Sequence, residues 1–524
     1  MHAASIRLAV TWGLMALLIL LVGIAQGPTN AIMLINIGLI SGLMALGLNM
    51  QWGYAGLFNA GVMGSVVIGA IAVILITHDP IPMPTLPREE APQGAALNDY
   101  TRLMTAKLTH GRGLSNLLIS LVFFAAFTAA LTILWRRLAG HRRRAWIVIP
   151  AFVAGYIVFR LVYDPAVANI EAYQTASYGN IGGLGLGSWM QRLGLPFSGF
   201  WSVLIAWILG GLAAGGVAWL IGKITLGLRS DYFAIATLGI AEIVVSFAKN
   251  EQWLTRGVKN INAGSLGTPI ARPASSYVDQ DPQNGAILVK GMQDQPWLQQ
   301  FTAWIEGYDL RAFQASLPQN QHWDFRYLEP SFREAMITSA KLANLLSYTL
   351  IITAVLGLVF FLAHRALNSP WGRMMRAIRD NETAANAMGK DVVGRHLQVF
   401  VLGSIVIGIA GAMLVVVSGS GFTPNSYLAM RFTFLIWVMV IVGGSGNNSG
   451  VILGGMLIWF LWVQSDPAAS QFAASLPDSL KAVKAWVETS VPFFKFFFLG
   501  LILLLVLRFA PKGLIPEKGS QRRR

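Results

Sequence analysis

The chain contains no cysteine and few charged residues for its length. Cysteine is absent from all 524 residues, which excludes disulfides, thiolate metal sites and a cysteine nucleophile. Charged residues make up 12% of the sequence, whereas about 25% is usual in a soluble domain. The 7 histidines lie apart and mostly between apolar runs, so they do not indicate a metal site.

Signatures of common enzymes are missing as well. The sequence has no G-x-x-x-x-G-K-[ST] phosphate-binding loop, no H-E-x-x-H helix and no G-x-S-x-G turn. We therefore expect no catalytic residue, no metal and no cofactor in this chain. If the protein pumps a solute, another subunit must supply the energy.

Hydrophobic residues dominate what is present. They make up 55% of the sequence, and the mean hydropathy is +0.57. A helix needs about 20 apolar residues to cross the hydrocarbon, where the backbone must satisfy its own hydrogen bonds. Runs of this kind occupy 8–26, 31–49, 56–77, 114–134, 145–163, 199–222, 231–248, 346–364, 398–418, 432–446, 450–464 and 493–509. We predict an all-α polytopic transmembrane bundle of about 10–12 spans, forming one domain over 1–524.

Positive charge gathers beside the apolar runs. The formal net charge is +15, and dense basic groups lie at 136–144, 365–395 and 508–524. Such groups mark cytoplasmic loops under the positive-inside rule, so we do not expect nucleic-acid binding. Twelve alternating crossings place all three groups on one side and predict that both termini are cytoplasmic. The pair 432–446 and 450–464 is either two crossings or one re-entrant hairpin.

Two long polar segments fall on the opposite side in this scheme. Residues 78–113 are rich in proline and charge, and 249–345 carry tryptophans and short amphipathic pieces. We expect both to be extracytoplasmic. The longer one is either a small cap on the outer face or a loosely ordered insertion.

A basic segment over 365–397 leads into the apolar run at 398. It contains the small residues Ala384, Ala385 and Ala387, and Gly389 follows where a helix can end. A short helix with small side chains can dock into a groove on a partner protein. A solvated charged loop explains the same residues.

This segment resembles the coupling loop of ABC-importer permeases, whose pattern is E-A-A-x-x-x-G. Ala384, Ala385 and Gly389 match, but Thr383 holds the glutamate position and Glu382 lies one residue earlier. That offset is similar to the branched-chain amino-acid permeases, G-R-x-x-x-A-I-R-x-x-E-x-A-A-x-x-x-G. The matching residues are Gly372, Arg373, Ala377, Ile378, Arg379, Glu382, Ala384, Ala385 and Gly389.

Three further blocks are similar to the same family. LGLN…GYAGL over 46–57 resembles its second-span signature, and SDYFAIATLG over 230–239 with Glu242 resembles its D-Y-x-A-I-x-T-L-G-x-x-E block. FAPKGLI over 509–515 resembles its closing P-[RK]-G-L sequence. The blocks follow the expected order, while the two long outer segments depart from the family pattern.

The resemblance implies a permease subunit of an ATP-driven importer in the bacterial inner membrane. Its partners would be a second permease subunit, cytoplasmic ATPase subunits that bind the ATP, and a periplasmic solute-binding protein. The coupling loop would comprise Arg373, Arg379, Glu382, Ala384, Ala385 and Gly389. Branched-chain amino acids are the leading substrates, and permeases for urea or short amides share these motifs.

Two other classes remain open at this stage. An ion-coupled secondary transporter would work without an ATPase, and a membrane-embedded enzyme would need a polar catalytic cluster that the sequence does not show. Glu242 lies eleven residues after Asp231, roughly 16 Å into the bilayer at helical rise. It is a candidate for the translocation path, or a carboxylate that binds a neighbouring helix. Asp231 is expected to pair with Arg229 at the interface.

Polar residues also mark the junction between the second and third runs. Asn49, Tyr54 and Asn59 lie where glycines interrupt the apolar pattern. They either line the translocation path or serve helix packing.

Overall fold

The computed structural model describes residues 2–78, 95–138, 144–176, 183–195, 198–257, 296–306, 330–418, 422–477 and 481–517. Every element of regular secondary structure within these ranges is a helix. The prediction of an all-α chain is therefore confirmed.

Twelve long or apolar helices coincide with the twelve predicted runs. Ten segments of the described chain are long and apolar enough to cross a membrane, and two shorter apolar helices, α3 and α17, accompany them. The twelve helices are α1 (His2–Gln26), α2 (Pro28–Asn49), α3 (Val62–Thr77), α4 (Ala95–Arg137), α5 (Arg144–Ala176), α7 (Ser198–Thr225), α8 (Ser230–Asn250), α13 (Pro330–Asn368), α16 (Val392–Ser418), α17 (Ala429–Gly443), α18 (Asn448–Ser475) and α19 (Lys481–Phe509).

Shorter helices connect them. They are the π-helix η1 (Met50–Tyr54), α6 (Leu186–Arg192), α9 (Gln252–Thr255), α11 (Pro296–Glu306), α14 (Pro370–Asp380), α15 (Glu382–Ala387) and the 3-10 turn η4 (Pro424–Ser426).

The chain divides into two compact units. Unit 1 comprises Met1–His78, Leu184–Phe247 and Asn262–Arg524, and unit 2 comprises Asp79–Gly183 and Ala248–Ile261. A single permease domain over 1–524 stays a prediction, because one domain can comprise two compact units. The sequence pattern did not reveal the second unit because its two long helices are as apolar as the others.

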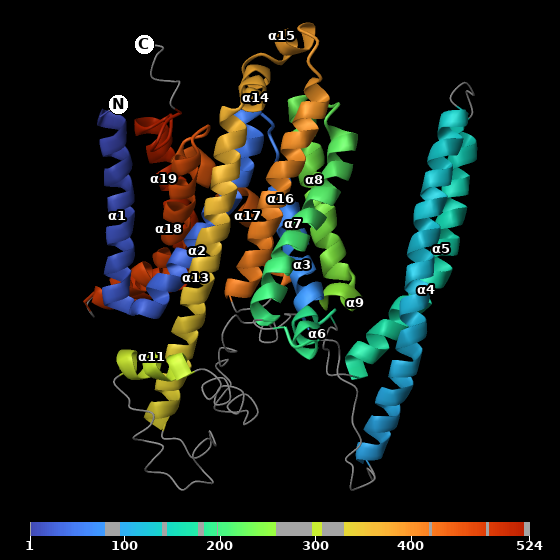
Figure 1. The fold of residues 1–524 in the computed structure, drawn as a ribbon, viewed down its shortest axis with the longest axis horizontal. Helices are drawn as coiled ribbons and strands as arrows, with labels where there is room; N and C mark the ends of the chain where they lie inside the picture. The colour runs from blue at the N-terminus through green and yellow to red at the C-terminus, as the bar shows by residue number, and fades with distance from the viewer. Residues whose placement is uncertain are drawn as a thin grey trace. The chain divides into compact units, whose positions relative to one another are not determined.

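Unit 1 is built around α2 and α16. Within their best apolar windows 78% of the residues of each are buried, against 11% for α1 and 6% for α19. In Figure 1, α14 and α15 lie at the end of this unit where α1 begins, and α6 and α11 lie at the other end. Residues 514 and 515 donate backbone hydrogen bonds to Val442 and Gly443, so the chain beyond α19 packs on the end of α17.

Small residues allow the inner helices to approach closely. A Cβ built on Gly69 of α3 would lie 2.0 Å from the carbonyl oxygen of Gly408 in α16. In lipid the helices gain little from the hydrophobic effect, so close packing of this kind holds the bundle together.

The α3–α16 crossing predicts a stability difference between two glycine variants. Gly69→Ala should destabilise the protein by about 1–3 kcal/mol, because the added methyl group forces the two backbones apart. Gly216→Ala in α7 is the control, since a Cβ there meets no atom within 4 Å. Thermal unfolding of the purified variants measures this, and equal melting temperatures would contradict the packing.

Unit 2 contains the helical hairpin α4–α5. Leu117, Tyr163, Ala166 and Ile170 form its core, and Trp253 packs against them. The Tyr163 hydroxyl donates to the Glu251 carboxylate at 2.6 Å, and Trp253 Nε1 donates to the same oxygen at 2.8 Å.

The two long polar segments are partly helical. Helix α4 begins at Ala95, so the second half of 78–113 is helix and not loop. All five prolines of that segment precede residue 95, and the residues that follow favour a helix. Within 249–345, α11 covers the amphipathic piece and α13 begins at Pro330, sixteen residues before the predicted span at 346. Residues 258–295 and 307–329 lie outside the described residues.

Candidate functional site

The junction between α2 and α3 is a break in helical structure. The π-helix η1 ends α2, and Gly56 adopts a φ of 74°, which side-chain-bearing residues rarely adopt. Residues 55–61 then run without a helix until α3 begins. Three polar side chains of this junction, Asn49, Gln51 and Asn59, are buried.

Asn49 lies at the last position of α2 and is fully buried. Its Nδ2 donates to Asn448 Oδ1 at 3.0 Å, and its Oδ1 accepts the Gly446 N–H at 2.9 Å. A Cβ on Gly53 would lie 2.1 Å from the same oxygen, so only glycine fits there. Asn49 therefore ties the junction to the turn between α17 and α18.

Asn59 belongs to a second buried network. Its Nδ2 donates to Gln51 Oε1 at 2.8 Å, and Gln51 Nε2 in turn donates to the Phe400 carbonyl at 2.9 Å. Trp437 Nε1 donates to the Asn59 carbonyl at 3.0 Å. The sequence analysis missed Gln51, although a glutamine beside the Gly-rich junction of an apolar run was a usable signal.

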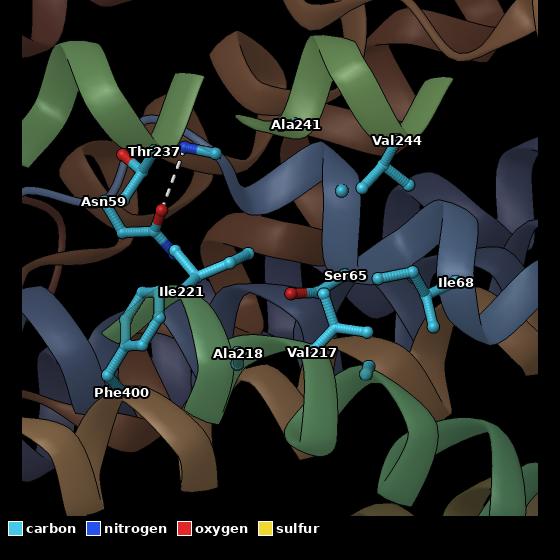
Figure 2. Close-up of a pocket in the computed structure, with 13 residues that line it drawn as sticks. Asn59, Ser65, Ile68, Val217, Ala218, Ile221, Thr237, Ala241, Val244 and Phe400 are labelled. Atoms are coloured by element: carbon cyan, nitrogen blue, oxygen red, sulfur yellow. Dashed lines mark hydrogen bonds between the residues drawn. The ribbon is translucent and has the colours of Figure 1, made fainter. Parts of the chain in front are cut away.

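A small pocket borders Asn59. Figure 2 shows it between α3, α7, α8 and α16, with the Gly61 N–H donating to Asn59 Oδ1 at 2.8 Å. Its volume is about 10 Å³, which is room for one water molecule. An amino acid does not fit in a pocket of this volume, and the place of Asn59 on the translocation path stays a prediction.

Tyr54 borders a much larger pocket at the end of unit 1 that carries α14. This pocket has a volume of about 1000 Å³. Its charged lining residues are Arg376, Arg379, Asp380, Lys512 and Glu517. Tyr54 itself is only 8% exposed, at the inner wall.

The predicted coupling segment forms the two helices α14 and α15. Helix α14 buries Gly372, Met375 and Ile378, and a Cβ on Gly372 would lie 2.1 Å from the Leu367 carbonyl oxygen. The tight approach folds α14 back on the end of α13. This half of the segment is therefore anchored to unit 1.

Arg379 connects α14 to the α2–α3 junction. Its guanidinium donates a hydrogen bond to the Gly53 carbonyl in η1, and Nη1 lies 3.4 Å from Glu517 Oε2. Arg373, two turns earlier, reaches only the Asn368 carbonyl at 3.4 Å. Of the two predicted arginines, Arg379 alone spans from the coupling segment to the break in α2.

Helix α15 projects from unit 1 with little cover. Glu382 and Ala384 are exposed, Ala385 is half-buried, and none of its residues is fully buried. The Asn381 side chain caps the helix by accepting the Ala384 N–H at 2.9 Å. Gly389, with a φ of 73°, ends it as expected from the sequence. Met388 is 79% exposed beside it, and the sequence analysis did not single it out.

Glu242 faces away from unit 1. It is exposed on α8, and among the described residues its carboxylate forms no ion pair. Asp231 and Arg229 are both exposed near the start of the helix, and the expected ion pair between them is not formed.

Comparison with known proteins places the chain in a family. Residues 30–507 match the model of the family described as "Branched-chain amino acid transport system / permease component". The chain belongs to this family. It is a permease component and a multi-pass membrane protein, as the resemblance implied.

Individual members of the family align with parts of this permease. Over 161 residues it is 32% identical to the probable branched-chain amino acid transport permease protein LivM of Methanocaldococcus jannaschii. This alignment covers 31% of this chain and 44% of that protein. Over 324 residues it is 24% identical to the high-affinity branched-chain amino acid transport system permease proteins LivM of Salmonella typhimurium and Escherichia coli. Those alignments cover 62% of this chain and 59% of each relative. No solved structure gives a significant match.

Proposed function

We propose that this permease is a membrane-spanning subunit of an ATP-driven importer of branched-chain amino acids. The observation that carries the proposal is the pair α14 and α15, in which an anchored helix presents an exposed one beyond the apolar helices. The printed names of the relatives and the coupling-loop pattern support the same assignment. The chain itself hydrolyses no ATP in this scheme.

Coupling in this proposal runs through direct contacts. A cytoplasmic ATPase subunit docks on α15, and its closure moves α14. Arg379 transmits the displacement to Gly53, and the Asn49 network joins that junction to the start of α18. The junction is suited to such movement because its helix is already broken.

The remaining partners and the orientation follow from the same proposal. The importer contains a second permease subunit, two ATPase subunits and a periplasmic solute-binding protein. The end of unit 1 that carries α14 and α15 faces the cytoplasm of a bacterial cell, and so do both termini. Urea or a short amide is the alternative substrate, and competition for leucine uptake distinguishes the two.

Met388→Asp tests the docking role of α15. The side chain is 79% exposed, so the folded chain loses little packing. An unpaired carboxylate in the docked interface should cost on the order of 2 kcal/mol or more, which weakens ATPase binding about thirtyfold. Copurification of ATPase subunits with the tagged permease measures it.

The matched control is Leu193→Asp. Leu193 is 57% exposed and follows α6, which lies at the opposite end of unit 1 from α15. It should retain the ATPase at the wild-type level. Equal capture by Met388→Asp and wild type would contradict docking on α15, and a wild type that binds no ATPase would contradict the importer itself.

A further inference from the structure

The large pocket beside Tyr54 is enclosed by unit 1 alone. Its walls are the end of α13, helix α14, the turn between α17 and α18 with the first residues of α18, and the chain beyond α19. Its volume of about 1000 Å³ is at the upper end of the range for sites that bind small molecules. The coupling route proposed above uses one contact at this wall, from Arg379 to the junction, and assigns no occupant to the pocket.

Arg376 of α14 brings an unpaired positive charge to the pocket wall. Its Nη2 donates to the Leu367 carbonyl at 3.2 Å, and within the described chain it forms no ion pair. Arg379, one turn later, is different because it pairs with Asp380 at 3.2 Å and with Glu517 at 3.4 Å. A guanidinium binds a carboxylate through several donors at once. Arg376 is therefore suited to the carboxylate of a ligand.

Glu517 brings an acceptor of opposite charge to the same pocket. Its Oε2 accepts both terminal nitrogens of Arg379 at 3.4 Å, which is long compared with the usual 2.7–2.9 Å or about that for such charged bonds. Its Oε1 has no hydrogen-bond donor among the described residues. The side chain is 24% exposed, so a ligand reaches it. A ligand ammonium group thus has an acceptor here.

The two charges lie near each other at the inner end of the pocket. Arg376, Arg379 and Glu517 are all close enough to the Tyr54 hydroxyl to interact with it electrostatically. Helix α13 adds an apolar part to the lining through Phe360 and Leu367. A cation, a carboxylate and an apolar surface in one pocket match the three parts of an amino acid with an apolar side chain.

A ligand in this pocket would bridge two parts of unit 1. Arg376 belongs to α14, whereas Glu517 belongs to the chain beyond α19, which is fixed to the end of α17 by the backbone bonds of residues 514 and 515. In the proposed coupling, α14 moves relative to the rest of unit 1. A ligand that binds the present arrangement best stabilises it and opposes that movement.

We propose that the pocket beside Tyr54 binds a free amino acid with an apolar side chain, such as leucine, and that its occupation slows uptake. Arg376 binds the ligand carboxylate, and Glu517 binds the ligand ammonium. The inference rests on the proposed function, because that function places this end of unit 1 in the cytoplasm, where the imported amino acid accumulates. It adds a site at which the delivered product inhibits its own import.

Binding to the complex purified through this chain tests the site. The complex is placed in lipid nanodiscs without the solute-binding protein, and the binding of labelled leucine is measured. Unlabelled leucine is compared as a competitor with 4-methylpentanoate, which lacks the ammonium group, and with isopentylamine, which lacks the carboxylate. We expect each analogue to compete at least tenfold more weakly than leucine. Equal competition by 4-methylpentanoate would make the pocket a simple anion site and overturn the proposal.

Variants of the two charged residues assign the binding to this pocket. Arg376→Gln should weaken leucine binding at least tenfold, and Glu517→Gln should lower the affinity for leucine to about that for 4-methylpentanoate. Arg376→Lys keeps the charge and should retain most of the binding. The matched control is Arg373→Gln in the same helix, because Arg373 lies outside the pocket lining and should leave the affinity unchanged. Wild-type affinity in Arg376→Gln would overturn the proposal, as would an equal loss in Arg376→Lys.

The inhibition is measured in proteoliposomes that contain ATP and increasing concentrations of unlabelled leucine. The initial rate of labelled-leucine uptake is expressed relative to the rate of the same protein without internal leucine. Saturating internal leucine should slow the wild type several-fold and leave Arg376→Gln at its own starting rate. An equal fall in both proteins, or no fall in the wild type, would overturn the proposal. Failure of the proposed function looks different, because ATP would then drive no uptake even without internal leucine, while the binding titration still tests the pocket.

Discussion

Replacing Arg379 by methionine is expected to reduce ATP-driven uptake about tenfold, or by about 1.4 kcal/mol of coupling, while ATPase subunits still bind. Arg379 is the side chain that joins α14 to the junction, through the Gly53 carbonyl and the Glu517 carboxylate. Methionine keeps a similar length and removes the donors. The substitution does not change the docking helix α15. ATPase binding should therefore stay at the wild-type level while ATP-driven uptake falls.

Arg373→Met is the matched control. It makes the same chemical change in the same helix, but Arg373 contacts only the end of the preceding helix, through the Asn368 carbonyl. Its uptake should stay near the wild-type rate. Wild-type uptake by Arg379→Met would remove Arg379 from the coupling route, and loss of ATPase binding in that variant would make it a docking residue.

Replacing Asn49 by alanine should lower the stability of the protein by about 2–5 kcal/mol. The substitution leaves the Gly446 N–H and the side-chain Oδ1 of Asn448 without the partner that each has now, and each buried orphan costs about 1–3 kcal/mol. Thermal unfolding of the purified permease measures the loss. Suppressed uptake should accompany it, since the junction is no longer tied to α18.

Asn30→Ala is the control for Asn49. It removes the same side chain from the same helix, but Asn30 is exposed and donates only to the Gln26 carbonyl one turn back. Its melting temperature should be close to that of the wild type. If Asn49→Ala were equally mild, water would have to satisfy the buried groups, and the junction would be more open than the structure describes.

The helical architecture was readable from the sequence for a simple reason. Lipid forces each span to be a continuous apolar run with internal hydrogen bonds, so the twelve runs and the twelve helices coincide. Helix ends outside the membrane were less predictable. The early starts of α4 and α13 depend on polar residues that favour a helix in one context and a loop in another.

The candidate site was predicted only in part. The ending of α15 at Gly389 is a local property of a glycine with positive φ, and the sequence indicated it. The bond from Arg379 to Gly53 joins residues 326 positions apart, and no local pattern reports such a contact. Glu242 was expected to lie deep in the membrane, but which way it faces depends on how α8 packs on its neighbours.

Reconstituted transport tests the central claim most directly. The complex captured through this permease is placed in proteoliposomes, and ATP is enclosed inside them so that it reaches the complexes whose ATPase subunits face the interior. The solute-binding protein and labelled leucine are added outside, and leucine uptake is measured. The proposed importer predicts uptake that requires ATP and is lost in Met388→Asp. Uptake that proceeds without ATP under an ion gradient, at the same rate in both proteins, would contradict it and make this chain a secondary transporter.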